Sequence, residues 1–240
     1  QNTKLQELNK TKDKFFSIIA HDLKNPIISS KGLSEILVNE YDTLNDNEKK
    51  ELIQILFDSA SQTSELLENL LNWSRSQRGK ISFEPAIIDL KKFIKSNINL
   101  LQSQSHTKEI EIIYSEIPGL YVLADNYMIN TIIRNLLSNA IKFTPNKGKI
   151  IISNEIIEND KIKISITDTG VGIPQEKIPK IFDISQKISS PGTNQEKGTG
   201  LGLILCKEFL EKHNSYLTIQ SEVGKGTKIT FELQKATQIT

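Results

Sequence analysis

Glycine is distributed unevenly along this chain of 240 residues. Only two of the twelve glycines, Gly32 and Gly79, fall within the first eighty residues, and the other ten lie beyond. Glycine weakens helices, and it is favoured in tight turns and where the backbone must approach a ligand closely. The distribution therefore predicts two differently built halves, the first helical and the second rich in turns.

The first half has the apolar periodicity of two long helices. Apolar residues recur at three- and four-residue steps from Leu5 to about Val38, and again from Leu52 to Trp73. The second helix is expected to end near Gly79, because glycine commonly follows the last turn of a helix. Two helices joined by a short polar connection predict an antiparallel hairpin.

The connection between the two helices carries a start signal. Asn45 is followed three residues later by Glu48, a spacing that predicts a capping box at the start of the second helix. Each helix of a hairpin has only one neighbour, so part of its apolar stripe stays uncovered. We therefore expect two copies of the chain to form a homodimer through a four-helix bundle.

The second half alternates between strand and helix patterns. The stretch from Ile162 to Thr167 alternates apolar and polar residues, which indicates a sheet with one buried face. We expect strands at 110–114, 120–123, 149–157, 161–167, 216–221 and 227–233, and helices at 125–143 and 201–212. This half is predicted to be an α+β sandwich, with residues 182–198 as a lid or binding loop.

Composition and charge exclude several kinds of partner and several structural features. Thirty basic residues against twenty-nine acidic ones make nucleic acid an unexpected partner. No apolar run approaches the length of a membrane span, so we expect no direct membrane contact. Cys206 is the only cysteine, which excludes an internal disulfide. The only methionine is Met128, and we expect the chain to be a fragment of a longer protein.

Four short motifs of the second half combine residues suited to a nucleotide and its metal. Residues 134–143 (RNLLSNAIKF) place Asn135, Asn139 and Lys142 on one helix face. Amide oxygens can ligate a divalent cation, and lysine can bind phosphate. Residues 168–173 (DTGVGI) pair a carboxylate with two glycines, residues 198–203 (GTGLGL) precede a helix, and residues 224–227 (GKGT) predict a turn.

Together these motifs resemble the N, G1, G2 and G3 boxes of the catalytic domain of sensor histidine kinases, with Phe182 as the F box. Residues 15–26 (FFSIIAHDLKNP) resemble the phosphoacceptor H box of the same family. The resemblance implies a dimerisation and histidine phosphotransfer domain at 1–79, a linker at 80–85 and an ATP-binding catalytic domain at 86–240. It implies the fold shared by histidine kinases and gyrase-type ATPases.

The resemblance also implies a set of residues that bind ATP and Mg²⁺. Asp168 would receive the adenine amino group, Asn135 and Asn139 would hold Mg²⁺, Lys142 would bind phosphate, and Phe143 would lie near the base. The remaining residues expected to bind the nucleotide are Gly170, Gly172, Ile173, Gly198, Thr199, Gly200, Leu201, Gly202 and Thr227.

His21 is the expected phosphoacceptor. Pro26 falls inside the predicted helix, where it removes a backbone hydrogen bond. The resemblance implies that Nε2 of His21 attacks the γ-phosphate while Asp22 holds the proton on Nδ1, as an orienting carboxylate does in other nucleophilic sites. The phosphoryl group would then pass to an aspartate of a response-regulator receiver domain, and Asn25 would orient water in a receiver phosphatase reaction.

Two alternatives stay open. One is an ATPase of the gyrase and chaperone superfamily, although those hydrolases carry a glutamate where this chain has Asn135, and an amide cannot act as a general base. The other is a catalytically silent dimerisation scaffold. For the kinase we expect a cytoplasmic location, as part of a membrane-anchored sensor whose upstream region is absent from this fragment.

Overall fold

The structure is a computed structural model that describes residues 2–77, 82–183, 190–196, 198 and 200–237. The chain separates into two compact units, a helical hairpin that reaches Gln77 and an α+β domain that holds most of the remaining chain. The predicted helix end at Gly79 lies outside the described residues, and so do residues 184–189 of the predicted lid.

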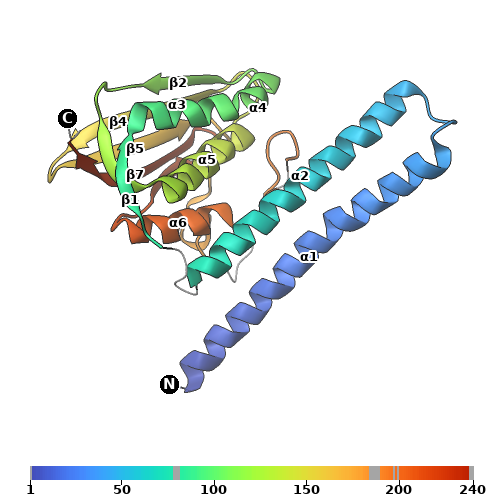
Figure 1. The fold of residues 1–240 in the computed structure, drawn as a ribbon, viewed down its shortest axis with the longest axis horizontal. Coiled ribbons are helices and arrows are strands. Elements are labelled where there is room, and N and C mark those ends of the chain that lie inside the picture. Colours follow the sequence, from blue (N-terminus) through green and yellow to red (C-terminus); the bar gives the residue numbers. More distant parts are fainter. Residues whose placement is uncertain (1, 78–81, 184–189, 197, 199, 238–240) are drawn as a thin grey trace. The chain divides into compact units, whose positions relative to one another are not determined.

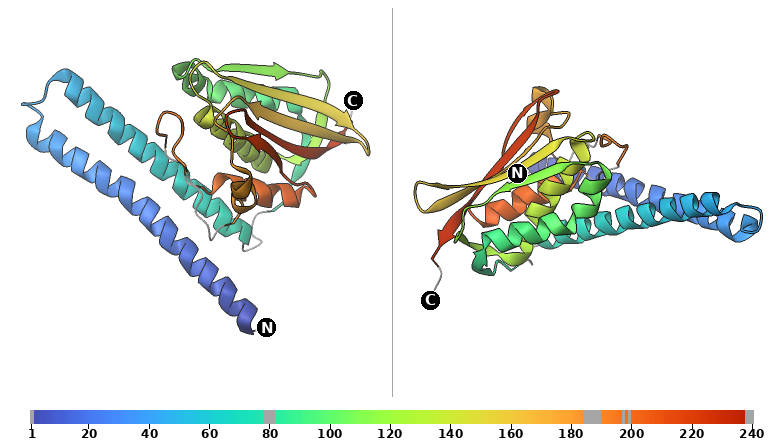
Figure 2. Two further views of the ribbon diagram at one scale, coloured as in Figure 1. Left: turned by 180° about the vertical axis from the view of Figure 1, so that it is seen from behind. Right: turned by 90° about the horizontal axis from the view of Figure 1, so that it is seen from above.

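The hairpin consists of α1 (Asn2–Glu40) and α2 (Asp46–Gln77), which run antiparallel along their length in Figure 1 and in both views of Figure 2. Pro26 lies inside α1, as expected. The Ser59 hydroxyl of α2 donates a hydrogen bond of 3.0 Å to the Pro26 carbonyl. This hydrogen bond joins the two helices at Pro26 and Ser59. The predicted helical hairpin is confirmed.

The predicted capping box opens α2. The backbone N–H groups of Asn47 and Glu48 each donate to Asn45 Oδ1 at 3.0 Å. In return, the Asn45 backbone N–H donates to Glu48 Oε2 at 2.8 Å. The two side chains thus satisfy three backbone donors at the start of the helix, where no intrahelical acceptor exists.

Large apolar side chains stay exposed on the hairpin. At the level set by Pro26 and Ser59, Phe57 is 66% exposed and Ile27 and Ile28 are each 55% exposed. Soluble monomers rarely expose apolar side chains in such groups. This uncovered surface is what a second copy would cover in the expected four-helix bundle, which stays a prediction.

In the described part of the α+β domain, seven strands form one sheet in the order β1-β3-β7-β5-β4-β2, with β6 also pairing with β7. Only β2 and β4 run parallel, and the other pairs are antiparallel. The strands are β1 (Pro85–Asp89), β2 (Glu111–Ser115), β3 (Tyr121–Asp125), β4 (Lys149–Ile157), β5 (Lys161–Asp168), β6 (Thr218–Glu222) and β7 (Gly226–Ala236).

Helices cover one face of this sheet, as Figures 1 and 2 show. They are α3 (Leu90–Leu100), α4 (Gln102–Thr107), α5 (Asn126–Phe143) and α6 (Gly202–Lys212), with a 3-10 helix at Gln175–Lys180. Helix α5 buries Met128, Ile132 and Leu136 against strand residues such as Ile164 and Phe231. This single apolar core confirms the predicted α+β sandwich with one buried sheet face.

Three elements at the start of this domain are missing from the sequence prediction: β1, α3 and α4. For the other strands and α-helices of this domain, the predicted boundaries differ from the observed ones by two residues or fewer, except that β7 extends three residues further, to Ala236. The expected domain limits of 1–79, 80–85 and 86–240 stay a prediction, and Pro85 already pairs with Asp125 in the sheet.

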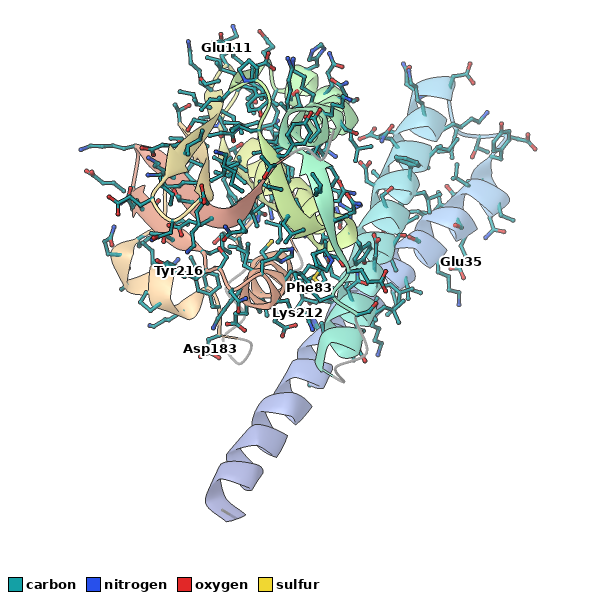
Figure 3. The ribbon with its side chains drawn as sticks, turned by 60° about the vertical axis from the view of Figure 1, so that its left-hand side comes forward. Glu35, Phe83, Glu111, Asp183, Lys212 and Tyr216 are labelled. Atoms are coloured by element: carbon teal, nitrogen blue, oxygen red, sulfur yellow. The ribbon has the colours of Figure 1, made fainter. Side chains whose placement is uncertain are left out.

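Residues just before β1 are tied to the domain by a hydrogen-bond relay. The Glu84 backbone N–H donates to Asp125 Oδ2 at 2.9 Å, and the Asp125 backbone N–H donates to His213 Nε2 at 3.0 Å. His213 is therefore a neutral imidazole that donates from Nδ1 to the Phe209 carbonyl, and burial lowers its pKa. The Phe83 ring meets the His213 ring edge-on, with ring centres 4.9 Å apart. Phe83 is labelled in Figure 3.

The turn after α6 contains a residue in the left-handed conformation that glycine usually supplies. In this chain, Asn214 occupies that position after His213. Asn214 adopts a positive φ of 52°, a conformation that asparagine tolerates better than most residues. The turn therefore keeps its left-handed geometry without glycine.

We predict that Asn45→Ala loosens the first turn of α2. Loss of an N-cap side chain costs about 1 kcal/mol, so amide hydrogen exchange in peptides that cover this turn is expected to accelerate roughly fivefold. Asn47→Ala is the matched control, because no side-chain bond of Asn47 contributes to the capping box. Equal exchange in the two variants would contradict the capping role.

Candidate nucleotide-binding site and phosphoacceptor

The carboxylate of Asp168 lies at the end of β5 and is 8% exposed. Its Oδ1 accepts hydrogen bonds from the backbone N–H groups of Gly170 at 2.8 Å and Thr227 at 3.2 Å. Burial raises the pKa of Asp168, and these two bonds oppose the rise. Both of these bonds end on Oδ1 and neither on Oδ2.

The side chain of Ser221 is a second polar group at this end of the sheet. The Ser221 hydroxyl of β6 accepts a hydrogen bond from the Ile173 backbone N–H at 2.8 Å and lies 2.8 Å from Thr227 Oγ1. It donates to the Gly226 carbonyl at 2.9 Å. Ile173 and Thr227, both predicted site residues, are thus joined through Ser221, which the sequence analysis did not identify.

Two glycines allow the backbone to close tightly around Asp168. A Cβ added to Gly226, whose φ is +100°, would lie 2.0 Å from the Asp168 carbonyl oxygen. A Cβ added to Gly170 would lie 2.5 Å from the Phe143 carbonyl oxygen and 2.6 Å from Asp168 Oδ1. The sequence needs glycine at both positions because other parts of the backbone occupy the space of a side chain.

Helix α5 presents the predicted amide and ammonium groups opposite its buried face. Asn135, Asn139, Lys142 and Phe143 are all partly exposed, whereas Leu136 is fully buried. The Lys142 Nζ lies 4.8 Å from the centre of the Phe143 ring, within the range of a cation–π contact. The Val171 backbone N–H donates to the Phe143 carbonyl at 3.1 Å, which joins this helix end to the loop after Asp168.

The start of α6 approaches the same face of α5. A Cβ added to Gly202 would lie 2.6 Å from Asn135 Oδ1, so the glycine allows the helix to begin beside the amide. Leu201, the N-cap residue, offers no side-chain acceptor to the first turn of α6. The N–H groups of a helix start favour anions, and here they lie next to the predicted metal-binding amide.

The chemistry of these groups fits a magnesium ion held together with a nucleotide. Asn135 Nδ2 donates to the Thr131 carbonyl at 2.9 Å, which directs Oδ1 away from that carbonyl and toward α6. Within the described residues there is no cluster of three or more His, Cys, Asp or Glu side chains. The amide oxygens of Asn135 and Asn139 are of a type that can ligate a divalent cation.

Several predicted positions are only partly described. Gly198 and Gly200 are described, and Gly200 adopts a positive φ of 70°. Thr199 lies outside the described residues. Gly172 also has a positive φ, of 71°. The structure thus brings the described predicted nucleotide residues to the end of β5, the exposed face of α5 and the start of α6.

His21 lies on α1 in the other unit and is exposed, with 69% of its side-chain surface accessible. Its Nδ1 lies 3.2 Å from Asp22 Oδ1, the contact expected for a carboxylate that holds the Nδ1 proton. Asn25 Nδ2 lies 3.4 Å from Nδ1 and 3.3 Å from Nε2 of the same ring. The three predicted phosphoacceptor residues therefore form one local group.

No sequence motif marks three further residues that meet beside the C-terminal end of α5. The buried Lys108 contacts Thr193 and Glu196 there. A buried lysine has no local pattern that sets it apart from a solvated one, because its partners lie far away in the sequence. For the proline- and glycine-containing stretch around Thr193, the sequence predicts a lid or binding loop but not which residues it contacts.

Two family models match the chain. Residues 11–79 match the His Kinase A (phospho-acceptor) domain. Residues 124–237 match the family described as histidine kinase-, DNA gyrase B-, and HSP90-like ATPase. Among curated relatives, the circadian input-output histidine kinase CikA of Synechococcus elongatus is 29% identical over 238 residues, covering 98% of this chain and 31% of that protein.

Solved histidine kinase structures share the fold. Full-length ShkA in complex with AMPPNP has a TM-score of 0.66 at 21% identity, over 93% of this chain and 46% of that one. The histidine kinase ThkA, in complex with the response regulator protein TrrA, has a TM-score of 0.65 at 24% identity, over 97% of this chain and 66% of that one.

A phosphoacceptor domain followed by an ATPase domain of this type defines a two-component histidine kinase core. The chain belongs to that family. It spans less than a third of the length of the first curated relatives it matches. In the described part of the chain, no helix is both long and apolar enough to span a membrane.

We predict that Gly170→Ala disrupts the nucleotide site. The added methyl group would meet the backbone of Phe143 and the Asp168 carboxylate, so the loop must move and nucleotide affinity is expected to fall at least tenfold. Gly32→Ala is the control, because a Cβ added at Gly32 has nothing within 4 Å and this glycine lies in α1, outside the nucleotide site. Fluorescence titration with a labelled ATP analogue measures both, and wild-type affinity in Gly170→Ala would contradict the assignment.

Proposed function

We propose that this core transfers the γ-phosphoryl group of ATP to Nε2 of His21. The observation that carries the proposal is the contact of His21 Nδ1 with Asp22 Oδ1 on an exposed imidazole. A proton held on Nδ1 leaves the electron pair of Nε2 for attack. A bond forms between Nε2 and the γ-phosphorus, the bond from that phosphorus to the bridging oxygen breaks, and ADP leaves with the electron pair.

In this proposal the α+β domain positions the triphosphate. Oδ2 of Asp168 accepts a hydrogen bond from the adenine amino group, and Phe143 lies beside the adenine ring. Asn135 and Asn139 hold Mg²⁺, which neutralises phosphate charge when bound. Lys142 and the backbone of residues 198–202 contact the phosphates. Phosphoryl transfer depends mainly on such positioning and charge neutralisation, so these groups and His21 suffice for the reaction.

The phosphoryl group would pass next to an aspartate of a receiver domain. The ThkA relative of known structure is in complex with a response regulator, which supports a partner of this kind. Asn25 is the residue proposed for a phosphatase role, and its amide nitrogen lies near both ring nitrogens of His21. From that position the amide can orient a water molecule toward a receiver docked at His21.

Dimerisation belongs to the same proposal. The exposed apolar surface at Ile27, Ile28 and Phe57 is the part of the hairpin that a second copy would bury. The match to the phosphoacceptor domain family supports this arrangement. The expected cytoplasmic location and membrane anchor of the parent protein stay predictions.

The gyrase-type ATPase alternative is disfavoured by one residue. A hydrolase needs a general base for water, and Asn135 Nδ2 instead donates to the Thr131 carbonyl while its oxygen faces α6. The amide carries no basic electron pair at neutral pH. The silent-scaffold alternative is disfavoured by the ordered contacts of Asp168 with Gly170 and Thr227.

We predict that incubation with γ-labelled ATP and Mg²⁺ labels the wild-type chain with acid-labile phosphate. His21→Gln should carry no label above background, because the nucleophile is gone. His106→Gln is the control, since His106 is an exposed helical histidine of the other unit. Label on His21→Gln would refute the assignment. ADP formation without phosphohistidine would favour the ATPase, and no ATP binding at millimolar concentration would favour the scaffold.

We predict that Asn25→Ala lowers phosphatase activity toward a phosphorylated receiver at least tenfold while autophosphorylation persists. The reason is that the amide orients water, whereas phosphoryl transfer to His21 needs the Asp22 contact. Asn25→Thr is the matched variant, because a hydroxyl can also orient water. Full phosphatase activity in Asn25→Ala would contradict this role.

A further inference from the structure

Lys108 is a buried cation at the C-cap of α4, with only 4% of its side chain exposed. Its Nζ donates to the carbonyl oxygens of Ile141 at 2.8 Å and Lys142 at 3.0 Å, at the end of α5. It also donates to Thr193 Oγ1 at 2.6 Å and to Glu196 Oε1 at 2.9 Å. One ammonium group thus joins the last turn of α5 to the second half of the predicted lid.

The lid segment at this contact has a defined shape. The Gly192 backbone N–H donates to the Glu196 carbonyl at 2.8 Å, and the Gln195 N–H donates back to the Gly192 carbonyl at 3.0 Å. The second carboxylate oxygen of Glu196 accepts from the Asn194 N–H at 2.8 Å. Residues 192–196 therefore form a closed turn, with Glu196 bonded both to the turn and to Lys108.

The same turn is bonded directly to the end of α5. The Thr193 backbone N–H donates to the Lys142 carbonyl at 3.0 Å, and its hydroxyl donates to the Thr144 carbonyl at 2.9 Å. A Cβ added to Gly192 would lie 2.6 Å from Lys142 Cγ. The turn therefore packs against the stem of the lysine that is proposed to bind phosphate.

Opposite charges favour the contact between Lys108 and Glu196. A buried ammonium needs a countercharge, which Glu196 supplies, and the carbonyl end of α5 also favours a cation. Burial alone would raise the pKa of Glu196, but its bonds from Lys108 and from backbone N–H groups lower it overall. Because Lys108 and Glu196 compensate each other only while the turn stays against Lys108 at the end of α5, separating the turn from this site is costly.

We propose that Lys108, Thr193 and Glu196, the lid clasp, are positioning residues for the triphosphate end of ATP. The clasp lies between two proposed phosphate contacts, Lys142 on α5 and the glycine loop that begins at Gly198. It bonds to the Lys142 backbone, and Glu196 stands two residues before Gly198 in the sequence. This inference rests on the proposed nucleotide site and adds residues that no nucleotide box contains.

The test compares Lys108→Met, Glu196→Gln and Thr193→Val with three controls. Lys147→Met removes a lysine whose side chain is 76% exposed, and Thr193→Ser keeps the hydroxyl. Wild type is the third control. Melting temperature, affinity for ATP and for ADP with Mg²⁺, and the rate of His21 phosphorylation at saturating ATP are measured for each variant.

We expect the three clasp variants to bind ATP at least about tenfold more weakly, as the loss of a hydrogen bond to a charged group implies. The loss should be greater for ATP than for ADP, because the clasp acts on the phosphate end. Thr193→Ser and Lys147→Met should resemble wild type. A simple loss of stability would lower the affinity for both nucleotides equally.

Two results would overturn the clasp. One is wild-type affinity for ATP in Glu196→Gln and Thr193→Val with unchanged melting temperatures, and the other is an equal loss of ATP and ADP affinity in all clasp variants. If Lys108→Met does not fold, the other two variants decide, because Thr193 and Glu196 are partly exposed. Nucleotide affinity is read without phosphotransfer, so a wild type that binds ATP and leaves His21 unlabelled refutes the kinase proposal and not the clasp.

Discussion

The antiparallel pairing of β5 with β7 is the constraint on which the nucleotide site depends. The two strands are in register over eight residues, from Lys161 opposite Gln234 to Asp168 opposite Thr227. This register brings the Thr227 N–H to the Asp168 carboxylate and places Gly226 against the Asp168 backbone. A shift of one residue would turn Asp168 toward the other face of the sheet and separate it from both partners.

The elements that the sequence predicted well are those whose evidence is local. The hairpin follows from apolar spacing within each helix, and the start of α2 follows from the Asn45 and Glu48 pair, whose partners lie within three residues. The signals for α3 are also local, although no helix was predicted there. Asp89 accepts a hydrogen bond from the Lys92 N–H and caps the helix. Leu90 and Ile94, both buried, stand at helical spacing. By contrast β1 is an edge strand whose first three residues are exposed, so it lacks the alternation of a half-buried strand.

The residues of the candidate site also divide into those with local sequence evidence and those whose partners lie far away in the sequence. Asp168 and the glycine motifs were found because the family pattern is written in short runs of sequence, and the structure brings the described members together. Lys108 could not be found in that way, since its partners in α5 and the lid lie 33 to 88 residues away. Ser221 is a similar case, because its importance comes from Ile173, 48 residues earlier. Contacts of this kind become visible only when the chain is folded.

The relay from Glu84 through Asp125 to His213 has a further consequence for how the two units can move. Because the Glu84 backbone is bonded to the α+β domain, the covalent link between this anchored residue and the end of α2 runs from Gln77 to Glu84. Six residues lie between those two positions, and seven Cα steps span about 25 Å when fully extended. The tether length therefore sets an upper limit on the travel of the ATP-binding domain. In the proposed dimer, that limit would restrict which copy of His21 a given domain reaches, and insertion of residues before Glu84 would relax it.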